Sequence, residues 1–311
     1  MRMLVTGGAG FIGSHLVDAL INMGNDVVCI DNESAESNEK FYWNEKAHNF
    51  KIDICDYQLI YPLFENIDCV FHLASDARIQ PAILNPRKSV ETNAIGTFNI
   101  LEASRQNNVE RVVLSSTSST YGKKNPIPNI ETQKEDCLTP YSTAKIFGEN
   151  LAKVYYNLYG LKTISLRYFN VYGERQPLKG QYAPVIGLFL KQKQENKSLT
   201  IVGDGTQKRD FTHVQDVVQA NLAAGISFLY DELGFKDEDV FGQVYNIGCS
   251  KNYSILEIAS MISEDISFIP ARPGEAQETL SDTNKFRNIF KWSPNIQLNK
   301  WIGDFKNENN L

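Results

Sequence analysis

The amino-acid sequence predicts an α/β fold, a doubly wound parallel sheet followed by a smaller, discontinuous C-terminal lobe. Two observations predict the sheet. Short apolar runs of strand length alternate with amphipathic helical stretches through the first half of the chain, which is the pattern of βαβ units. A glycine-rich turn at 7–13 joins the first strand to the first helix. After residue 173 prolines and glycines interrupt the alternation, which indicates that the later segments build a second unit.

Composition narrows the class of protein. The chain has 311 residues and a formal net charge of −6, which argues against a nucleic-acid partner. No apolar run approaches the ~18 residues of a membrane span, so no membrane partner is expected. The five cysteines are scattered without a CxxC motif, which favours reduced thiols in a cytoplasm over disulfides or a metal site. A strand that begins at Arg2 leaves no room for a signal peptide, so we expect a cytoplasmic protein.

The glycine-rich turn has the spacing of a dinucleotide-binding loop. Gly8-x-Gly10-x-x-Gly13 follows a predicted strand over 2–5 and precedes a predicted helix over 14–23, and Gly7 adds an overlapping TGxxGxxG pattern. Glycines let the backbone turn tightly and approach a pyrophosphate, which then lies at the positive end of the helix. A plain glycine-rich turn is the alternative, but the flanking strand and helix and a downstream carboxylate favour the dinucleotide.

That carboxylate is Asp31, at the end of a second predicted strand over 26–30. It follows the glycines by about 20 residues, the separation expected of the acid that binds an adenosine ribose. A carboxylate there accepts a hydrogen bond from a free 2′-hydroxyl and repels a 2′-phosphate, so it favours NAD over NADP. The alternative is an acid that only shapes the turn after the strand.

The remaining elements follow in order. A polar surface loop is predicted over 34–49. Strands are then predicted over 50–54, 68–74, 110–115 and 163–167, with helices over 90–105 and 141–160, and a loop over 123–140. Beyond 173 we predict a helix ending at 194, a strand over 199–203, a helix over 211–228, a strand over 244–248, and short helices and loops over 254–311. We accordingly predict a cofactor domain of residues 1–172 with 211–250, and a lobe of residues 173–210 with 251–311.

A tyrosine and a lysine stand at i and i+4 where the helix over 141–160 begins. Tyr141-Ser-Thr-Ala-Lys145 places a phenol and an ammonium on one helix face. The spacing alone is weak, since Tyr42 and Lys46 repeat it in the polar loop, where we interpret it as a surface pair. The pair at 141–145 differs because the preceding strand ends in Ser-Ser-Thr at 115–117, at the sheet edge where a nicotinamide would lie.

These side chains suggest acid–base chemistry on an alcohol. The phenol of tyrosine has an ordinary pKa of about 10, and a nearby ammonium and a positive nicotinamide both favour its phenolate. The phenolate can take a proton from a sugar alcohol while the same carbon gives hydride to NAD. Thr117 can hydrogen-bond the reacting oxygen. The alternative is a helix-surface pair beside a strand-end turn.

The chain resembles the extended short-chain dehydrogenase/reductase family, most closely its NAD-dependent nucleotide-sugar 4-epimerases of the UDP-glucose/UDP-N-acetylglucosamine type. The resemblance extends from Met1 to about Asp282. It rests on an ordered set of motifs, namely TGGAGFIG at 6–13, Asp31-Asn32, Asp53-Ile54, HLA at 72–74, Asn93, SST at 115–117, YSTAK at 141–145, RYFNVYG at 167–173, GDGTQKRDF at 203–211, YNIG at 245–248 and RPGE at 272–275.

The resemblance implies a Rossmann-type first domain and assigns roles to residues. The catalytic residues would be Thr117, Tyr141 and Lys145. The residues that bind NAD would be Gly7, Gly10, Phe11, Ile12, Gly13, Asp31, Asn32, Asp53, Ile54, Leu73, Ala74, Asn93, Ser115, Tyr141, Lys145 and Tyr168. The residues that bind the nucleotide sugar would be Thr117, Asn170, Val185, Arg209, Arg272 and Thr279.

Two arginines suit a pyrophosphate, because each guanidinium can fork onto phosphate oxygens. Taken alone, Arg209 and Arg272 would be interpreted as solvated surface charge. His72, His213 and the pair Asp210 and Asp216 are interpreted as structural, and no metal is expected.

The resemblance also narrows the reaction. Related dehydratases and decarboxylases carry an acid just after the catalytic Ser/Thr, whereas this chain has Ser118-Ser119. Epimerisation needs no such acid: the sugar is oxidised to a 4-keto intermediate, rotates, and is reduced on the opposite face while NAD is regenerated. A small Thr279 leaves room for an N-acetyl group. Of Ala77 and Arg78, either could face the substrate.

The resulting expectation is a homodimeric 4-epimerase of a UDP-hexose or UDP-N-acetylhexosamine, paired through the helices over 90–105 and 141–160. Another nucleotide-sugar enzyme of the family remains an alternative, namely a 4-reductase, a 2-epimerase or a CDP-, GDP- or dTDP-sugar epimerase. A non-catalytic NAD-sensing module is an alternative of a different class, disfavoured because a pure binder needs no base. The exact sugar, the nucleotide base and the downstream pathway stay open.

Overall fold

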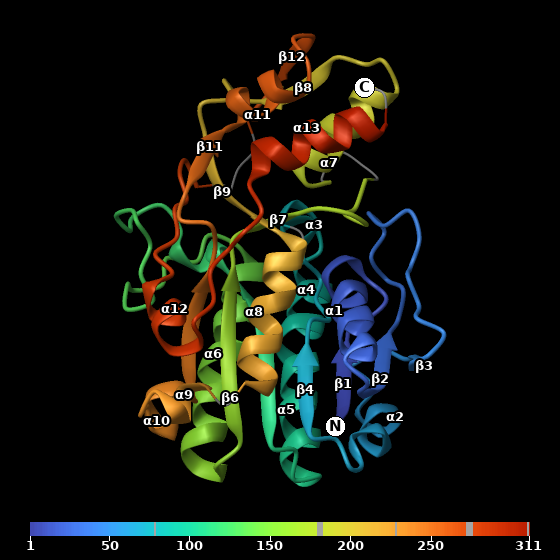
Figure 1. The fold of residues 1–311 in the computed structure, drawn as a ribbon, viewed down its shortest axis with the longest axis vertical. Coiled ribbons are helices and arrows are strands. Elements are labelled where there is room, and N and C mark those ends of the chain that lie inside the picture. The colour runs from blue at the N-terminus through green and yellow to red at the C-terminus, as the bar shows by residue number, and fades with distance from the viewer. Residues whose placement is uncertain (78, 179–182, 228, 272–275, 310) are drawn as a thin grey trace.

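A computed structural model describes residues 1–77, 79–178, 183–227, 229–271, 276–309 and 311. It shows a parallel sheet between two helical layers, with a smaller lobe over the carboxyl ends of the strands (Figure 1). The strands are β1 (Arg2–Thr6), β2 (Asp26–Asp31), β3 (His48–Lys51), β4 (Cys69–His72), β5 (Arg111–Thr117), β6 (Lys162–Tyr168), β7 (Asn170–Tyr172), β8 (Leu199–Val202), β9 (Lys208–His213), β10 (Gln243–Ile247), β11 (Asn252–Ser254) and β12 (Ile266–Ile269).

The helices include several short turns. They are α1 (Phe11–Asn22), α2 (Tyr57–Ile60), η1 (Tyr61–Phe64), α3 (Ile79–Leu84), α4 (Pro86–Val90), η2 (Glu91–Gly96), α5 (Thr97–Gln106), η3 (Ser118–Tyr121), α6 (Pro140–Tyr159), α7 (Val185–Gln194), α8 (Val214–Ile226), α9 (Leu229–Glu232), α10 (Asp237–Val240), α11 (Ile255–Ile262), α12 (Asn284–Phe290) and α13 (Leu298–Glu308).

The central sheet has seven parallel strands in the order β10-β6-β5-β4-β1-β2-β3. The order reverses between β1 and β4, and in such sheets ligands bind beyond the carboxyl ends of the strands at this switch point. The predicted fold class, a Rossmann-type doubly wound sheet with a smaller lobe, is confirmed.

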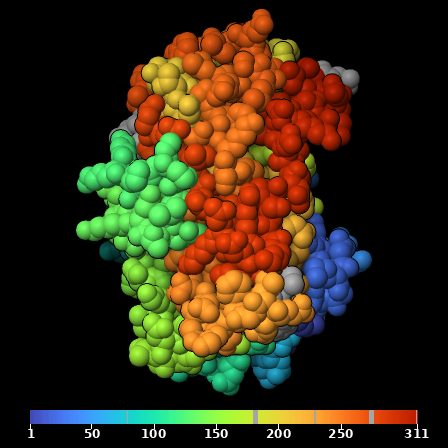
Figure 2. Space-filling view, turned by 60° about the vertical axis from the view of Figure 1, so that its left-hand side comes forward, coloured from blue at the N-terminus to red at the C-terminus, as the bar shows by residue number. Residues whose placement is uncertain are grey.

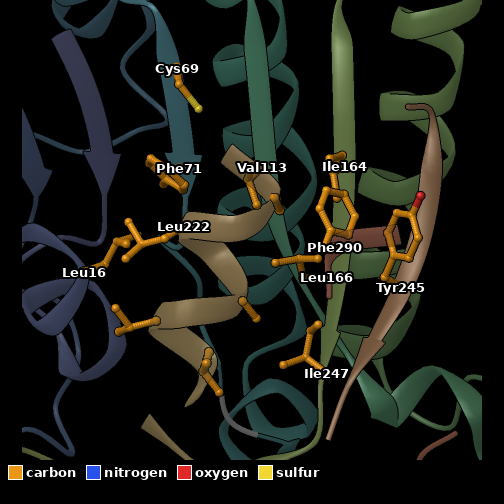
Figure 3. Close-up of a cluster of buried hydrophobic side chains, with 14 of the residues drawn as sticks. Leu16, Cys69, Phe71, Val113, Ile164, Leu166, Leu222, Tyr245, Ile247 and Phe290 are labelled. Carbon is orange, nitrogen blue, oxygen red and sulfur yellow. The ribbon is translucent and has the colours of Figure 1, made fainter. Parts of the chain in front are cut away.

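Each face of the sheet carries its own core. On one face Leu16 of α1 and Leu222 of α8 pack against Phe71 and Val113 of the strands (Figure 3). On the other face residues of α2, α5 and α6, including Ile100 and Ala152, cover Leu4 and Val112. A strand buried on both faces reads as a continuous apolar run, which is why the central strands were predictable.

The lobe has a third core, formed by α7, α11 and α13 with β8 and the sheet β11-β9-β7, while β12 pairs with β8 at the edge of this core. The loop between η3 and α6, green in Figure 2, stands out beside the C-terminal residues. Asn129 N donates to Leu280 O at 2.6 Å, which ties this loop to the C-terminal segment. The predicted boundaries of the two domains stay a prediction. Across the described ranges, no helix has the length and apolar character to cross a membrane.

Four element predictions are wrong in position. The third strand, predicted over 50–54, is β3 at 48–51, so it begins two residues earlier, in the predicted polar loop, because an edge strand with exposed faces needs no apolar pattern. The helix over 90–105 is three pieces with a π-turn at 91–96, where the Thr97 hydroxyl donates to Asn93 O at 2.8 Å. The helix over 211–228 begins as strand β9. The segment 254–311, predicted to hold only helices and loops, contains β12.

Candidate active site

A large cavity lies between the carboxyl ends of the central strands and the lobe. Its volume is about 1090 Å³, and its walls come from the glycine turn, the ends of β2, β4, β5 and β6, helix α6, and lobe residues of α7, β8 and β9. Binding cavities for a single small ligand are usually between about 300 and 1000 Å³. The volume lies just above this range, and the walls come from both the sheet and the lobe, so the cavity suits ligands larger than a single small molecule.

The glycine turn forms one wall and depends on two glycines for close approach. Gly7 has φ +68°, and a Cβ there would lie 2.7 Å from Ala74 N. A Cβ on Gly13 would lie 2.1 Å from Gly7 O, so helix α1 can start against the turn only without a side chain. This close packing leaves the first turn of α1 facing the cavity, where its N–H groups can meet a phosphate.

Asp31 lies at the end of β2, beside the glycine turn. Its carboxylate accepts hydrogen bonds from Ala9 N at 3.1 Å and from Glu33 N at 2.8 Å, and it lines the cavity. Burial raises the pKa of Asp31, while these backbone donors oppose the shift. A carboxylate held at this place fits the hydroxyls of an adenosine ribose, so the turn and Asp31 together fit NAD.

The three predicted catalytic residues meet in this cavity. Thr117 ends β5, and its hydroxyl donates to Ser119 Oγ at 3.1 Å and accepts from Ser119 N at 3.1 Å. Tyr141 and Lys145 lie on the first turns of α6, and the side chains of both line the wall. Thr139 caps this helix in a reciprocal pair with Ser142, and Pro140 follows it as the first helical residue. The cap explains why the helix starts where it presents the pair to the cavity.

Lys145 is anchored to β5. Its Nζ donates to Ser115 O at 3.0 Å, and only 5% of the residue is exposed. Burial lowers the pKa of Lys145 to about 8, and the negative charge of Glu149 opposes that shift. The ammonium therefore lies in a low-dielectric site, where it acts more strongly on a neighbouring phenol than it would in water.

His72 is a structural residue beneath the cofactor wall, as the sequence predicts. Ala74 N donates to Thr6 Oγ1 at 3.2 Å, and the Thr6 hydroxyl lies 2.7 Å from His72 Nδ1. His72 Nε2 lies 2.9 Å from Thr97 Oγ1, whose hydrogen is donated to Asn93 O. This direction of donation requires a proton on Nε2, and in the neutral ring Nδ1 then accepts from the Thr6 hydroxyl. Burial, with a smaller contribution from Lys145, lowers the pKa of His72 to about 3.

A pH dependence of stability follows from His72. The unfolded state takes up a proton below the ordinary pKa of 6.5 and the folded state only near 3, so stability falls as the pH drops through this window. The expected slope is about 1.4 kcal/mol per pH unit for one proton. In His72→Gln the free energy of unfolding, measured in urea across the window, should fall less steeply by that amount. An unchanged slope in His72→Gln would contradict the prediction.

Most of the predicted NAD residues line the cavity. They are Gly7, Gly10, Phe11, Ile12, Gly13, Asp31, Asn32, Ile54, Leu73, Ala74, Ser115, Tyr141, Lys145 and Tyr168. Asp53 is exposed and outside the cavity lining, and its carboxylate accepts from Asn32 Nδ2 at 2.8 Å. Asn93 is fully buried, and its Oδ1 accepts from Ser75 Oγ at 2.7 Å and Asp76 N at 3.1 Å. Both residues therefore support wall segments, and their predicted contact with NAD stays a prediction.

The predicted substrate residues come from both the central sheet and the lobe. Thr117, Asn170, Val185, Arg209 and Thr279 all line the cavity. Thr279 is nearly buried and its hydroxyl lies 3.4 Å from Asp210 N, while Arg209 Nη1 donates to Lys208 O at 2.8 Å. Ala77 also lines the cavity. The predictions for residues 78 and 272, the two remaining arginines, fall outside the described residues.

Other wall residues were missed from the sequence. Ser75, Asp76, Lys88 and Gln207 line the cavity although no recognised motif assigns them a role. Burial raises the pKa of Asp76, and Lys88 opposes this. Ser75 and Asp76 directly follow the HLA motif at 72–74. Their position next to this motif could have predicted that they line the cavity.

The other residues interpreted as structural make internal contacts. The Asp210 carboxylate accepts from Cys249 N, Ser250 N and Ser281 N at 2.8 to 3.0 Å. The Asp216 carboxylate accepts hydrogen bonds from the backbone N–H groups of Asn295 and Ile296. His213 caps α8 by accepting from Gln215 N at 3.2 Å. The two carboxylates tie the C-terminal residues 281, 295 and 296 to β9 and α8.

A dinucleotide-dependent α/β enzyme is the class that this fold and cavity define. The sequence model of the NAD-dependent epimerase/dehydratase family matches residues 3–248. A putative UDP-glucose 4-epimerase from Methanocaldococcus jannaschii is 37% identical over 308 residues, which cover 96% of this chain and 95% of that protein. The chain thus belongs to the NAD-dependent epimerase/dehydratase family, within the extended short-chain dehydrogenases/reductases, and its cofactor is NAD.

Solved structures agree with this assignment. The UDP-glucose 4-epimerase of Thermus thermophilus, in complex with NAD, matches with a TM-score of 0.86 at 30% identity over 97% of this chain and 96% of that one. A UDP-N-acetylglucosamine 4-epimerase from Methanobrevibacter ruminantium, in complex with UDP-N-acetylmuramic acid, matches with a TM-score of 0.86 at 30% identity over 99% of this chain and 98% of that one.

Proposed function

We propose that the protein inverts C4 of a UDP-hexose or UDP-N-acetylhexosamine through a 4-keto intermediate. The observation that carries the proposal is the meeting of Thr117, Tyr141 and Lys145 in one cavity, between the wall that fits NAD and the lobe. Relatives named as 4-epimerases of UDP-glucose and of UDP-N-acetylglucosamine support it.

The chain's residues handle the proton of the sugar alcohol. NAD, when bound, supplies the acceptor and then the donor of hydride at C4. The Tyr141 oxygen removes the proton of the 4-hydroxyl and returns it to the inverted alcohol, and the buried Lys145 ammonium stabilises the phenolate in between. Thr117, at the end of β5, also lines the cavity and can hydrogen-bond the oxygen at C4 of the sugar. The walls limit water access to the keto sugar.

The residues after Thr117 favour inversion over elimination. Ser118 and Ser119 occupy the short turn η3 in place of an acid, and Ser119 bonds to Thr117. A hydroxyl there cannot act as the acid that dehydration requires. Thr279, small and at the cavity wall, leaves room for an N-acetyl group and supports UDP-N-acetylhexosamine as a substrate beside UDP-hexose.

Product analysis tests the proposal. Purified protein with its bound NAD should convert UDP-GlcNAc to UDP-GalNAc, or UDP-glucose to UDP-galactose, without net formation of NADH. Net consumption of NADH would indicate the 4-reductase, and inversion at C2 the 2-epimerase. Conversion of only CDP-, GDP- or dTDP-sugars would show that the substrate is not a UDP-sugar. Tight NAD binding without turnover of any of these sugars would indicate the NAD-sensing module.

We also propose a homodimer formed through α5 and α6, in a cytoplasmic protein. The two helices pack against each other and leave large apolar side chains on their outer faces. Of the predicted apolar faces, Ala144 and Tyr155 are buried, whereas Phe147 is 45% and Leu158 69% exposed. An exposed apolar stripe of this kind is typical of a protein interface. The five cysteines, all free, are consistent with a reducing compartment.

The dimer predicts a result for Phe147→Glu. A buried glutamate at the centre of an apolar interface would be unpaired, so the mass measured by light scattering should fall to roughly half the wild-type mass at micromolar concentration. Phe268→Glu, at an exposed aromatic residue in the lobe, should leave the mass unchanged. A wild-type protein that is already monomeric would overturn the proposal.

A further inference from the structure

A buried ion pair lies behind the catalytic residues and has no part in the chemistry above. Glu149 on α6 accepts from Arg167 Nε at 2.9 Å and Nη2 at 2.7 Å, in a bidentate arrangement. The two side chains are only 5% and 3% exposed. Burying two charges costs about as much as their pairing returns, so stability alone does not account for the pair.

The pair is connected to the strand end that carries the site. The Ser116 hydroxyl donates a short hydrogen bond to Glu149 Oε1. Ser116 lies between Ser115, whose carbonyl accepts from Lys145, and Thr117 at the cavity wall. Glu149 therefore holds the middle residue of three whose neighbours both serve the site.

Glu149 also faces Lys145 directly. It lies one helical turn beyond Lys145, so the two side chains share a face of α6. Both line a small cavity of about 10 Å³ together with Ser115, Ser116 and Ser165. That volume is about what one water molecule needs, so bulk water does not screen the two charges from each other. The negative charge of Glu149 raises the pKa of Lys145 against the effect of burial.

The other titratable groups around Lys145 leave Glu149 as its anionic neighbour within the described part of the chain. On α6 the second group is Tyr141, and on β4 it is His72, which is neutral at ordinary pH. Arg167 on β6 is paired with Glu149 itself. From β5 the Lys145 ammonium contacts the carbonyl and hydroxyl of Ser115, and the uncharged Ser116 and Thr97 line the same small cavity.

We propose that Glu149 is a positioning residue for this site: it holds Lys145 in its charged form and fixes the end of β5, so that Tyr141 gives up its proton first. The inference rests on the proposed function only in assigning the base to Tyr141. Without Glu149 the pair of Tyr141 and Lys145 would still lose one proton, but the proton would come from Lys145 and the phenol would stay protonated.

Glu149→Gln keeps the shape of the side chain and removes its charge. We expect the variant to bind NAD and to form the Tyr141 phenolate at higher pH than wild type, as measured by ultraviolet difference absorbance against the same protein with Tyr141→Phe. The alkaline limb of the pH profile of kcat should move to lower pH, because Lys145 loses its proton at lower pH in this variant. If the limb moves by one pH unit, kcat at pH values above it should be about tenfold lower than in the wild-type protein. Because the absorbance needs no sugar, it remains informative if the wild-type protein inverts none of the sugars tested.

Two further variants keep the test decisive. The double variant Glu149→Gln with Arg167→Gln leaves no unpaired buried guanidinium, so it can replace the single variant if that variant does not fold. Its Tyr141 phenolate should also form at higher pH than in the wild-type protein. Glu102→Gln breaks a similar bidentate pair with Arg105 that contacts α6 through Tyr155, away from the cavity, and should behave as wild type. A folded, NAD-binding Glu149 variant with unchanged phenolate absorbance and an unchanged kcat profile would overturn the proposal.

Discussion

Replacing Tyr141 with phenylalanine should lower kcat for C4 inversion by about 10³-fold, since a positioned acid–base group contributes roughly 10² to 10⁴. The variant loses one oxygen from a side chain that is only 8% exposed and keeps the ring that forms the wall. NAD should therefore remain bound, and the melting temperature should stay near the wild-type value. The measurement is the conversion of UDP-sugar by the NAD-loaded protein, with cofactor content determined after denaturation.

The chain provides a matched control for this variant. Tyr42 has the same i, i+4 relation to a lysine, but it lies in the loop after β2, with Arg175 5.0 Å over its ring. Tyr42→Phe should retain wild-type kcat. If Tyr141→Phe retains activity while binding NAD, another group is the base and the proposed assignment of Tyr141 is wrong.

Replacing Gly13 with alanine should destabilise the fold by more than about 3 kcal/mol, beyond what ordinary overpacking causes. The new Cβ would lie 2.1 Å from Gly7 O, a backbone atom of a turn that is itself confined by Ala74. Helix α1 would have to move away from the turn, and the N–H groups that face the cavity would move with it. NAD retention should be lost together with stability, which urea unfolding and cofactor content would show.

Gly303→Ala is the matched control for Gly13→Ala. Gly303 lies in helix α13, where a Cβ would meet no atom within 4 Å. Alanine is a better helix former than glycine by about 1 kcal/mol, so this variant should be at least as stable as wild type. Similar losses in both variants would contradict the steric argument for Gly13.

The parts of the site that depend on local sequence could be predicted. The glycine turn, Asp31 and the Tyr141–Lys145 pair are each defined by spacing within one strand–turn–helix segment, and all of them line the cavity. The bounds of the edge strand β3 were misplaced by two to three residues, because its mostly polar, exposed residues carry no burial pattern. The broken helix at 86–106 escaped it because the hydrogen bond from Thr97 to Asn93 O competes with the regular helix.

The fold class and the family could thus be inferred from the amino-acid sequence, and so could the proposed chemistry of residues that are close in sequence, because strand and helix periods and motif spacings are local properties. How those residues are supported became clear from the packed structure. Ser116, Glu149 and Arg167 come from three separate elements, and no spacing relates them until β5, α6 and β6 pack together. The same holds for the lobe, where Thr279 reaches Asp210 across 69 residues. Contacts between distant segments depend on packing, and packing gives the proposed catalytic pair its buried, charged surroundings.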